Sequence, residues 1–252
     1  MLLLRSLLFH ACFHLNTILH LIFYLPFLLL PRRIFWKAVH SWARVNHWLL
    51  RTICGTNFEI IGYERIPPGA LLIAAKHQSA WETFALVTLF SDPFYVLKRE
   101  LMWLPVFGWY IAKAEMIPIR RGAGGTALGE IIERAKVEIA RGRQLILFPE
   151  GTRRAVGAEP AYKFGGVRLY KELGVRCFPV ALNSGVFWPR RKLVIYPGTI
   201  RMEFLEPIEP GLPEGEFAAR MQDAIETATA RLVAQGRAEL EVTLRQRVGK
   251  AG

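Results

Sequence analysis

Residues 70–84 read ALLIAAKHQSAWETF, and the pattern of this stretch changes in its middle. The first six residues, 70–75, are all apolar, and their number suits a strand that is buried on both faces. From residue 80 onward the apolar residues recur at helical spacing, which predicts a helix over 80–90. A buried strand that passes through a short polar loop into a helix is typical of α/β proteins with a parallel sheet. The stretch therefore predicts this class of fold.

The chain after residue 55 continues the alternation of strands and helices. Further short apolar runs predict strands at 93–97, 144–148 and 175–182. Amphipathic patterns predict helices at 127–140 and at 216–236, the second of which ends at Gly236. Two strand-like runs on either side of Pro197-Gly198 predict a hairpin. We expect one α/β domain over 55–252, with a mostly parallel central sheet that is flanked by helices.

The first 54 residues differ in composition from the rest of the chain. No charged residue occurs between Arg5 and Arg32, so the range 6–31 is a long apolar segment. At about 1.5 Å per residue, a helix of this length could cross a hydrocarbon core of about 30 Å. Pro26 interrupts the segment, which leaves a helix immersed in one leaflet as an alternative. We expect residues 1–54 to be membrane-associated helices.

The range 34–53 follows as a basic, tryptophan-rich amphipathic helix. Its polar residues recur at spacings of three and four and form one stripe: Lys37, His40, Arg44, His47 and Arg51. Such a helix suits the headgroup region of an anionic membrane, although a surface helix packed on the domain has the same pattern. Basic residues directly after the apolar segment favour the cytoplasmic side. We therefore expect the protein at the inner membrane, with its α/β domain facing the cytoplasm.

The charge of the chain indicates the kind of partner. It has 33 Lys and Arg residues against 21 Asp and Glu residues, which gives a formal net charge of +12. Such an excess indicates nucleic acid, an anionic membrane or phosphate-bearing substrates. Nucleic acid is disfavoured because the charge lies beside an apolar segment and no nucleic-acid-binding motif occurs. The three cysteines have no CxxC spacing, so we expect neither disulfides nor a metal site.

His77 and Glu82 lie where ligands bind in α/β folds, beyond the carboxyl end of a strand. A histidine that takes a proton from a hydroxyl needs a second group to fix its tautomer, and Glu82 could supply it. On one continuous helix, side chains that are five positions apart point in directions about 140° apart. His77 and Glu82 can therefore meet only if the chain turns between them. Ser79-Ala-Trp-Glu82 has the form of a capping box, with Ser79 as N-cap and Glu82 binding its backbone N–H. A helix cap and a catalytic pair are both open interpretations.

Glycine and arginine follow another predicted strand in FPEGTR, residues 148–153. The backbone N–H groups of a glycine turn beside guanidinium groups suit a phosphate. Further basic residues occur in KRE at 98–100 and in IRR at 119–121, and a solvated surface is the simpler interpretation of any single cluster. Neither a P-loop nor a G-x-S-x-G elbow occurs, so Ser184 is a poor candidate for a nucleophile.

The segments HQSAWE, KRELMWLPVFG, IPIRR, FPEGTR and FPVALNSG resemble the successive motifs of the glycerolipid acyltransferase family. Within that family they are most similar to the bacterial 1-acyl-sn-glycerol-3-phosphate acyltransferases. The resemblance covers residues 55–205, in the order and spacing of the family, and a membrane-bound N-terminal segment is also usual there.

The resemblance implies roles for individual residues. His77 corresponds to the general base that deprotonates the lysolipid hydroxyl, and Glu82 corresponds to the acid that orients it. The positions that bind the phosphate or shape the glycerophosphate site correspond to Lys98, Arg120, Glu150, Gly151, Thr152 and Arg153. The motif of the family usually has aspartate at the position of Glu82. The extra methylene of glutamate means that the distance to His77 must be set differently here.

The resemblance also implies a reaction, in which a fatty acyl group moves from an acyl thioester to the sn-2 hydroxyl of lysophosphatidic acid. The product is phosphatidic acid, the donor is acyl-CoA or acyl-carrier protein, and no cofactor is needed. Two alternatives stay open. One is the same chemistry on glycerol 3-phosphate or a lyso-aminolipid. The other is a non-catalytic membrane protein that binds anionic lipid, which leaves the loops around His77 and at 148–153 without a role.

Overall fold

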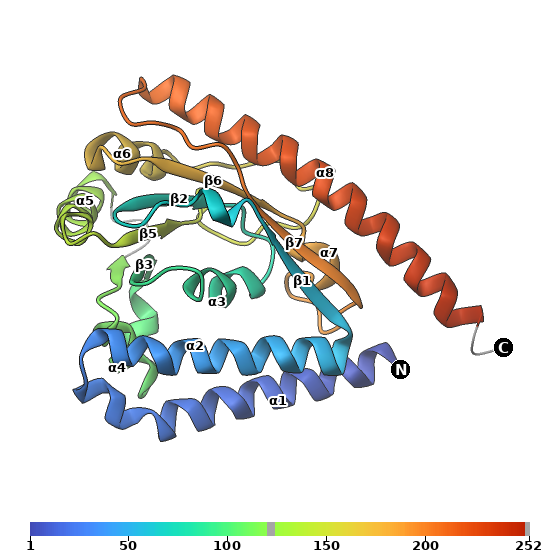
Figure 1. Ribbon diagram of the computed structural model, residues 1–252. Helices are drawn as coiled ribbons and strands as arrows, with labels where there is room; N and C mark the ends of the chain where they lie inside the picture. The colour runs from blue at the N-terminus through green and yellow to red at the C-terminus, as the bar shows by residue number, and fades with distance from the viewer. Residues whose placement is uncertain (120–123, 250–252) are drawn as a thin grey trace.

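The computed structural model describes residues 1–119 and 124–249, and its elements lie in layers around a central sheet (Figure 1). Within these ranges the sheet has seven strands, in the order β1-β7-β6-β2-β5-β3-β4. The strands are β1 (Thr56–Ile61), β2 (Leu71–Ala75), β3 (Pro93–Lys98), β4 (Ile117–Ile119), β5 (Gln144–Leu147), β6 (Cys177–Leu182) and β7 (Gly198–Phe204). Every neighbouring pair is parallel except β6 and β7. The predicted mostly parallel sheet is confirmed.

The predicted hairpin around Pro197-Gly198 is wrong. Only the second run is a strand, β7, and it pairs with β1 and β6 instead of with the residues before it. The first run lies along the N-terminal helix, where the Ser6 hydroxyl accepts a hydrogen bond from the Ile195 N–H at 2.9 Å. Because these backbone groups bond to a helix, they are not available to a neighbouring strand.

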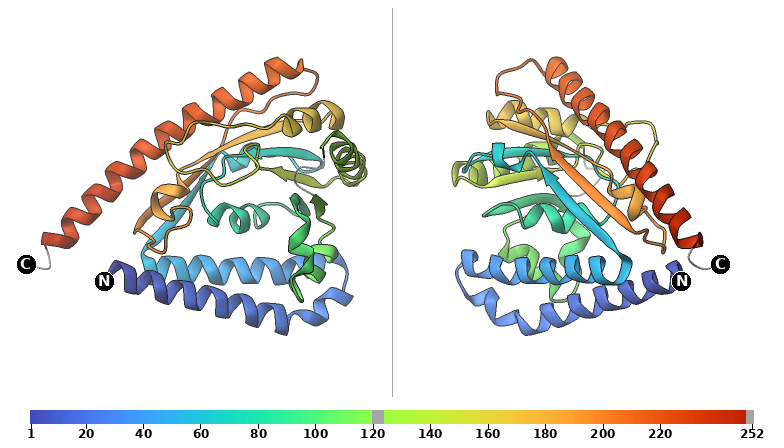
Figure 2. Two further views of the ribbon diagram at one scale, coloured as in Figure 1. Left: turned by 180° about the vertical axis from the view of Figure 1, so that it is seen from behind. Right: turned by 45° about the vertical axis from the view of Figure 1, so that its right-hand side comes forward.

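The helices cover both faces of the sheet (Figures 1 and 2). They are α1 (Leu2–Phe23), α2 (Arg32–Leu49), α3 (Trp81–Val87), α4 (Phe107–Lys113), α5 (Gly124–Ala140), α6 (Phe164–Leu173), α7 (Ser184–Phe187) and α8 (Glu214–Gly249). Shorter helical turns are η1 (Leu25–Leu29), η2 (Leu50–Cys54), η3 (Tyr63–Arg65) and η4 (Arg99–Trp103). The helix predicted over 80–90 is α3 and is shorter than expected, whereas α5 matches its predicted range closely.

The last helix does not end at Gly236, as predicted, but continues to Gly249, and its final turns extend beyond the sheet (Figure 2). Gly236 is needed for close packing and not as a helix stop. A Cβ at this position would lie 2.8 Å from Nδ2 of Asn183 and 3.2 Å from the Phe187 ring. A glycine within a helix is often kept for such an approach, at a cost in helix propensity of about 1 kcal/mol.

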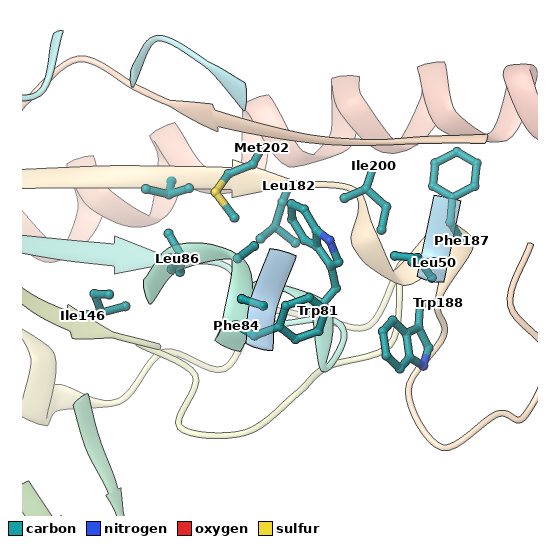
Figure 3. Close-up of a cluster of buried hydrophobic side chains, with 14 of the residues drawn as sticks. Leu50, Trp81, Phe84, Leu86, Ile146, Leu182, Phe187, Trp188, Ile200 and Met202 are labelled. Atoms are coloured by element: carbon teal, nitrogen blue, oxygen red, sulfur yellow. The ribbon is translucent and has the colours of Figure 1, made fainter. Parts of the chain in front are cut away.

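Strand β2 shows how the two faces are built. Leu71, Ile73 and Ala75 belong to the core between the sheet and α1, α2 and α3. Figure 3 shows aromatic and aliphatic side chains of this cluster, among them Trp81 and Phe84 of α3. The alternate residues of β2, which include Leu72 and Ala74, belong to the core beneath α5, α6 and α8. Successive side chains of a strand point to opposite faces, so the residues that follow Ala75 also diverge.

Helices α1 and α2 form a hairpin beside α3 (Figure 1). The hairpin is packed on the domain, because Phe9 of α1 and Ala43 of α2 are fully buried in the same core as the sheet residues. Among the described helices, α1 alone is long and apolar enough to cross a membrane, and 17% of its most apolar window is buried. Its outer face exposes large apolar side chains, which include Leu4 and Ile22.

The polar stripe predicted on α2 is only partly exposed. Lys37, Arg44 and Arg51 lie on the surface. His47 instead packs inward against the rings of Phe58 and Phe84, at centroid distances of 4.4 and 5.0 Å. Its burial lowers the pKa of His47 to about 4, so this ring is neutral at physiological pH. The stripe is therefore split between a basic surface and the contact with the domain.

Candidate active site

A cavity of about 1050 Å³ lies between the sheet and the N-terminal hairpin, at the carboxyl ends of β2, β3 and β5. Polar and cationic side chains line one part of it. Apolar side chains from α1, α2, α3, α4, α5 and α6 line the rest, among them Leu21, Val39, Phe84, Tyr110, Leu128 and Leu169. Parallel sheets place ligand sites at this edge. The cavity therefore suits a molecule with a charged end and a long apolar part.

His77 and Glu82 are in contact in this cavity. Nδ1 of His77 lies 2.9 Å from Oε1 of Glu82, whose side chain is 0% exposed. The same carboxylate oxygen accepts hydrogen bonds from the backbone N–H groups of Gln78 at 2.7 Å and Ser79 at 2.6 Å. The glutamate therefore reaches the imidazole in spite of its extra methylene. It does so from the first turn of α3, because the chain turns at residues 78–80.

The capping box is present in modified form. Helix α3 begins at Trp81, with Ala80 as the N-cap, one residue later than the motif predicts. Glu82 accepts the Ser79 N–H as expected, while the Ser79 hydroxyl accepts the N–H of Trp81 at 3.3 Å. One carboxylate thus caps the turn and holds the histidine, so the two interpretations of the sequence are compatible.

Ser184 is a member of the site that the sequence did not identify. Its hydroxyl donates a hydrogen bond of 2.8 Å to Oε2 of Glu82. Ser184 opens α7 directly after β6, and its neighbour Gly185 donates its N–H to the Gln78 side chain at 3.1 Å. The signal was the position of Asn183-Ser184-Gly185 after a predicted strand, which marks an edge loop. Glu82 thus accepts four hydrogen bonds, which compensate for the burial of its carboxylate charge.

The contact with Glu82 fixes which ring nitrogen of His77 is available. A carboxylate accepts a hydrogen bond from a nitrogen that carries a proton, so we assign the hydrogen to Nδ1 and the lone pair to Nε2. Nε2 has no hydrogen bond to the described residues, and His77 lines the cavity. The ring stacks on Phe148 with a centroid distance of 3.9 Å and an interplanar angle of 15°. The imidazole is thus held on two sides and can accept a proton on the third.

The loop after β5 carries the next group of predicted residues. Gly151, Thr152 and Arg153 line the cavity, and Gly151 has a positive φ of 64° in the turn. The Arg154 N–H donates to the His77 carbonyl at 2.8 Å, which ties this loop to the residue that carries the imidazole. Lys98, at the exposed end of β3, lines the same cavity. Arg120 lies outside the described residues.

Glu150 lies apart from the cavity. It is buried on the opposite face of β2, where Oε1 lies 3.0 Å from Nζ of Lys76. Nζ of Lys76 also lies 2.5 Å from Glu226 of α8. Glu226 in turn accepts a hydrogen bond of 2.9 Å from the Tyr162 hydroxyl. Burial raises the pKa of Glu150, and its bond to Lys76 opposes this shift. Glu150 therefore holds the base of the 148–153 loop and does not line the cavity.

Within residues 1–119 and 124–249, no three His, Cys, Asp or Glu side chains are grouped so that they could hold a metal ion. The cavity has instead a histidine with a carboxylate partner, several cationic side chains and apolar walls. This combination suits acid–base chemistry on a phosphate-bearing lipid.

The sequence model of the Acyltransferase family matches residues 57–183, half of the chain, which include the His77 and 148–153 loops. The chain belongs to the acyltransferase family. The motif resemblance is thereby confirmed.

Two Pseudomonas aeruginosa proteins are similar to this acyltransferase. One, a 1-acyl-sn-glycerol-3-phosphate acyltransferase, is 38% identical over 165 residues, which cover 66% of this chain and 64% of the relative. The other, a lyso-ornithine lipid O-acyltransferase, is 30% identical over 206 residues, which cover 73% of this chain and 78% of the relative. The chain thus matches slightly less than two thirds of the first relative.

The fold has a solved counterpart. The crystal structure of the 1-acyl-sn-glycerophosphate (LPA) acyltransferase PlsC from Thermotoga maritima matches with a TM-score of 0.75 and 23% identity. The match covers 92% of this chain and 99% of the other, so the two proteins share the fold over most of their length.

Proposed function

We propose that this acyltransferase transfers a fatty acyl group from an acyl thioester to the sn-2 hydroxyl of lysophosphatidic acid and releases phosphatidic acid. The observation that carries the proposal is the His77–Glu82 pair, whose open Nε2 faces a cavity with cationic side chains and apolar walls. The 38% identical relative with this activity supports the choice of acceptor. Acyl-CoA or acyl-carrier protein serves as the donor.

The proposed chemistry needs one base and no acyl-enzyme. The acceptor hydroxyl donates its proton to Nε2 of His77 while its oxygen attacks the thioester carbonyl carbon. The Glu82 carboxylate stabilises the positive charge that the ring gains. The tetrahedral intermediate then collapses, the carbon–sulfur bond breaks, and the leaving thiolate takes the proton back from His77. The products are an ester and a free thiol, and the histidine returns to its starting state.

The remaining groups position the acceptor. Arg153 and Lys98 line the cavity near the base and would bind the phosphate of lysophosphatidic acid. Thr152 and the turn at Gly151 shape the same region. The apolar walls of the cavity would hold acyl chains. The exposed apolar face of α1 supports association with a membrane, which we assign to the cytoplasmic side of the inner membrane.

The decisive experiment compares His77→Ala with the wild-type protein, with His14→Ala as a matched control. His14 is exposed on α1 and does not line the cavity. The purified His77→Ala protein should bind vesicles normally and lose transfer of a radiolabelled acyl group to lysophosphatidic acid. Near-normal turnover would exclude His77 as the base. If the protein only binds anionic lipid and is not an enzyme, the wild type itself will show no acyl transfer.

Arg153→Ala tests the choice of acceptor. Loss of a charge-assisted contact with the phosphate should raise the KM for lysophosphatidic acid by about tenfold or more. The measurement is repeated with glycerol 3-phosphate and with a lyso-ornithine lipid, an acceptor without a phosphate. An unchanged KM and rate with lysophosphatidic acid would remove Arg153 from the site. A higher kcat/KM of the wild type for the aminolipid would contradict the proposed acceptor.

A further inference from the structure

Two arginines of the cavity have no role in the function proposed above. Arg190 and Arg191 follow α7 in the segment Phe187-Trp-Pro-Arg-Arg191, and both line the cavity together with His77. Neither forms an ion pair with a carboxylate of the described residues. In contrast, Arg143 is bound to Glu138 at 2.8 Å and Arg201 to Glu239 at 2.7 Å, like most buried or half-buried arginines of the fold. The pair is thus free to bind an anion.

The segment that carries these arginines is held in place at both ends. Ser184, at its start, donates to Glu82. Trp188 packs edge-on against Phe9 of α1, with a centroid distance of 5.2 Å and an interplanar angle of 88°. After the arginines, the Leu193 carbonyl lies 3.0 Å from Nε2 of His10. The backbone that carries Arg190 and Arg191 therefore has a fixed position relative to Glu82 and to the N-terminal hairpin.

The cationic side chains of the cavity come from loops on both sides of β2, the strand that precedes His77. In the sheet, β2 lies between β6 on one side and β5 followed by β3 on the other, and these four strands are parallel. His77 follows β2. Arg153 and Lys98 follow β5 and β3, whereas Arg190 and Arg191 follow β6. The proposed acceptor residues and the Arg190–Arg191 pair thus enter one cavity from loops on opposite sides of β2.

The charges around Arg190 favour the binding of an anion. Partial desolvation and the positive charges of Arg191, Arg153 and Arg154 lower the pKa of Arg190. The guanidinium groups of these arginines repel one another, and a bound phosphate or carboxylate relieves the repulsion. A single phosphate monoester does not need all of these arginines. The proposed reaction, however, brings two phosphate-bearing substrates into this cavity.

We propose that Arg190 and Arg191 bind the phosphate of the 4′-phosphopantetheine arm of the acyl donor. This inference rests on the proposed function, and it assigns the β6 side of His77 to the donor and the β5 side to the acceptor. Acyl-CoA and acyl-carrier protein share this arm and its phosphate, so both donors would use the same pair. The thioester at the end of the arm would then reach the carbonyl position beside Nε2.

The test is the double substitution R190A/R191A in the full-length protein, with K192A as the control. Lys192 is exposed in the same segment and does not line the cavity. We expect the KM for the phosphate-bearing donor that the wild type uses to rise by about tenfold or more. The kcat at saturating donor and the KM for lysophosphatidic acid should stay unchanged. With acyl-pantetheine, which has the thioester arm but no phosphate, variant and wild type should be equal.

Other sources of phosphate give different outcomes. A rise in the KM for lysophosphatidic acid with an unchanged donor KM would assign the pair to the acceptor and overturn the inference. Reduced binding to phosphatidylglycerol vesicles with an unchanged donor KM would assign it to lipid headgroups and also overturn it. The same loss of rate with acyl-pantetheine would show that the phosphate is not involved.

A binding measurement separates this inference from the proposed function. Calorimetry with CoA and with carrier protein, without acceptor, should show binding to the wild type and to K192A, and about tenfold weaker binding to R190A/R191A. R190K/R191K, which keeps the charges, should recover much of the affinity if the fold is intact. If the wild type transfers no acyl group but shows this pattern, the proposed function fails and the inference stands. If neither ligand binds the wild type, the inference fails.

Discussion

Lys76 and His77 are neighbours in the chain, but their surroundings differ because they lie on opposite faces of the sheet. Lys76 meets Glu150 and Glu226 beneath α8, where its side chain is 4% exposed. His77 meets Glu82 beneath α3, and its ring is 13% exposed towards the cavity. Each residue thus has a buried glutamate partner that comes from a loop or helix packed on its own face.

The difference lies in what is left unbound. Lys76 is bound to two carboxylates, with the Tyr162 ring 5.7 Å from its ammonium group, and it lies away from the cavity. His77 is held at Nδ1 while Nε2 faces the cavity. A buried ion pair alone therefore does not mark a reactive group. The mark is a group that is fixed on one side and open to substrate on the other, as general acid–base catalysis requires.

The largest effect that we expect is a loss of activity in Glu82→Gln, which tests the contrast between His77 and Lys76. The amide oxygen can still accept the N–H groups of Gln78 and Ser79 and the Nδ1 hydrogen of His77, but the charge that stabilises a protonated ring is lost. We expect kcat to fall by about 10²- to 10⁴-fold with little change in the KM of either substrate. Steady-state kinetics of acyl transfer provides the measurement, and circular dichroism checks the fold.

Glu82→Asp is the matched control for this substitution, because it keeps the charge and shortens the reach by one methylene. It should retain more activity than Glu82→Gln and less than the wild type. Equal activity of all three proteins would show that the carboxylate does not assist His77, and the contrast between the two faces would lose its basis.

The next effect concerns stability and comes from Lys76→Met. This change leaves the buried Glu150 and the half-buried Glu226 without their shared cation. We expect the free energy of unfolding to fall by about 3–5 kcal/mol. Chemical unfolding in detergent provides the measurement, and K76M/E150Q should recover part of the loss because the buried acid is then neutral. A stable Lys76→Met protein with low kcat would instead place Lys76 in the chemistry.

The smallest effect is a pH dependence of stability at Glu150. Burial raises the pKa of this carboxyl in the folded protein, so the folded state holds a proton that the unfolded chain releases near pH 4.5. The stability that this proton contributes at low pH is lost as the pH rises from 4.5 through the raised pKa, by about 1.4 kcal/mol for each pH unit between the two pKa values. Glu150→Gln should lack this loss. The prediction is contradicted if the free energy of unfolding of the wild type and of Glu150→Gln changes with pH by the same amount from about pH 4 to 7.

Local patterns were sufficient for the central part of the fold. The apolar runs identified β2, β3, β5 and β6, which lie side by side, and of these β2, β5 and β6 are buried on both faces. They did not identify β1, whose residues include the polar Asn57 and Glu59 and are largely exposed, because it lies at the edge of the sheet. Strand β4 has three residues and contains Pro118, so it has no pattern of its own.

The same limit applies to the site. His77 and Glu82 are five positions apart, and a turn motif between them was enough to bring them together in the interpretation. Ser184 lies 102 positions from Glu82, and Glu226 lies 150 positions from Lys76. Contacts of this kind depend on which strands are neighbours and on where α8 packs. The spacing of residues along the chain predicts neither the strand order nor the position of α8.

The hairpin of α1 and α2 has a consequence for where the proposed reaction takes place relative to the lipid. Leu21 and Tyr24 form part of the cavity wall, while other residues of α1 expose apolar side chains on the outside. Because Phe9 of the same helix is buried in the domain core, no flexible tether separates the lipid-facing surface from His77. The imidazole would therefore work at one set depth relative to the lipid headgroups.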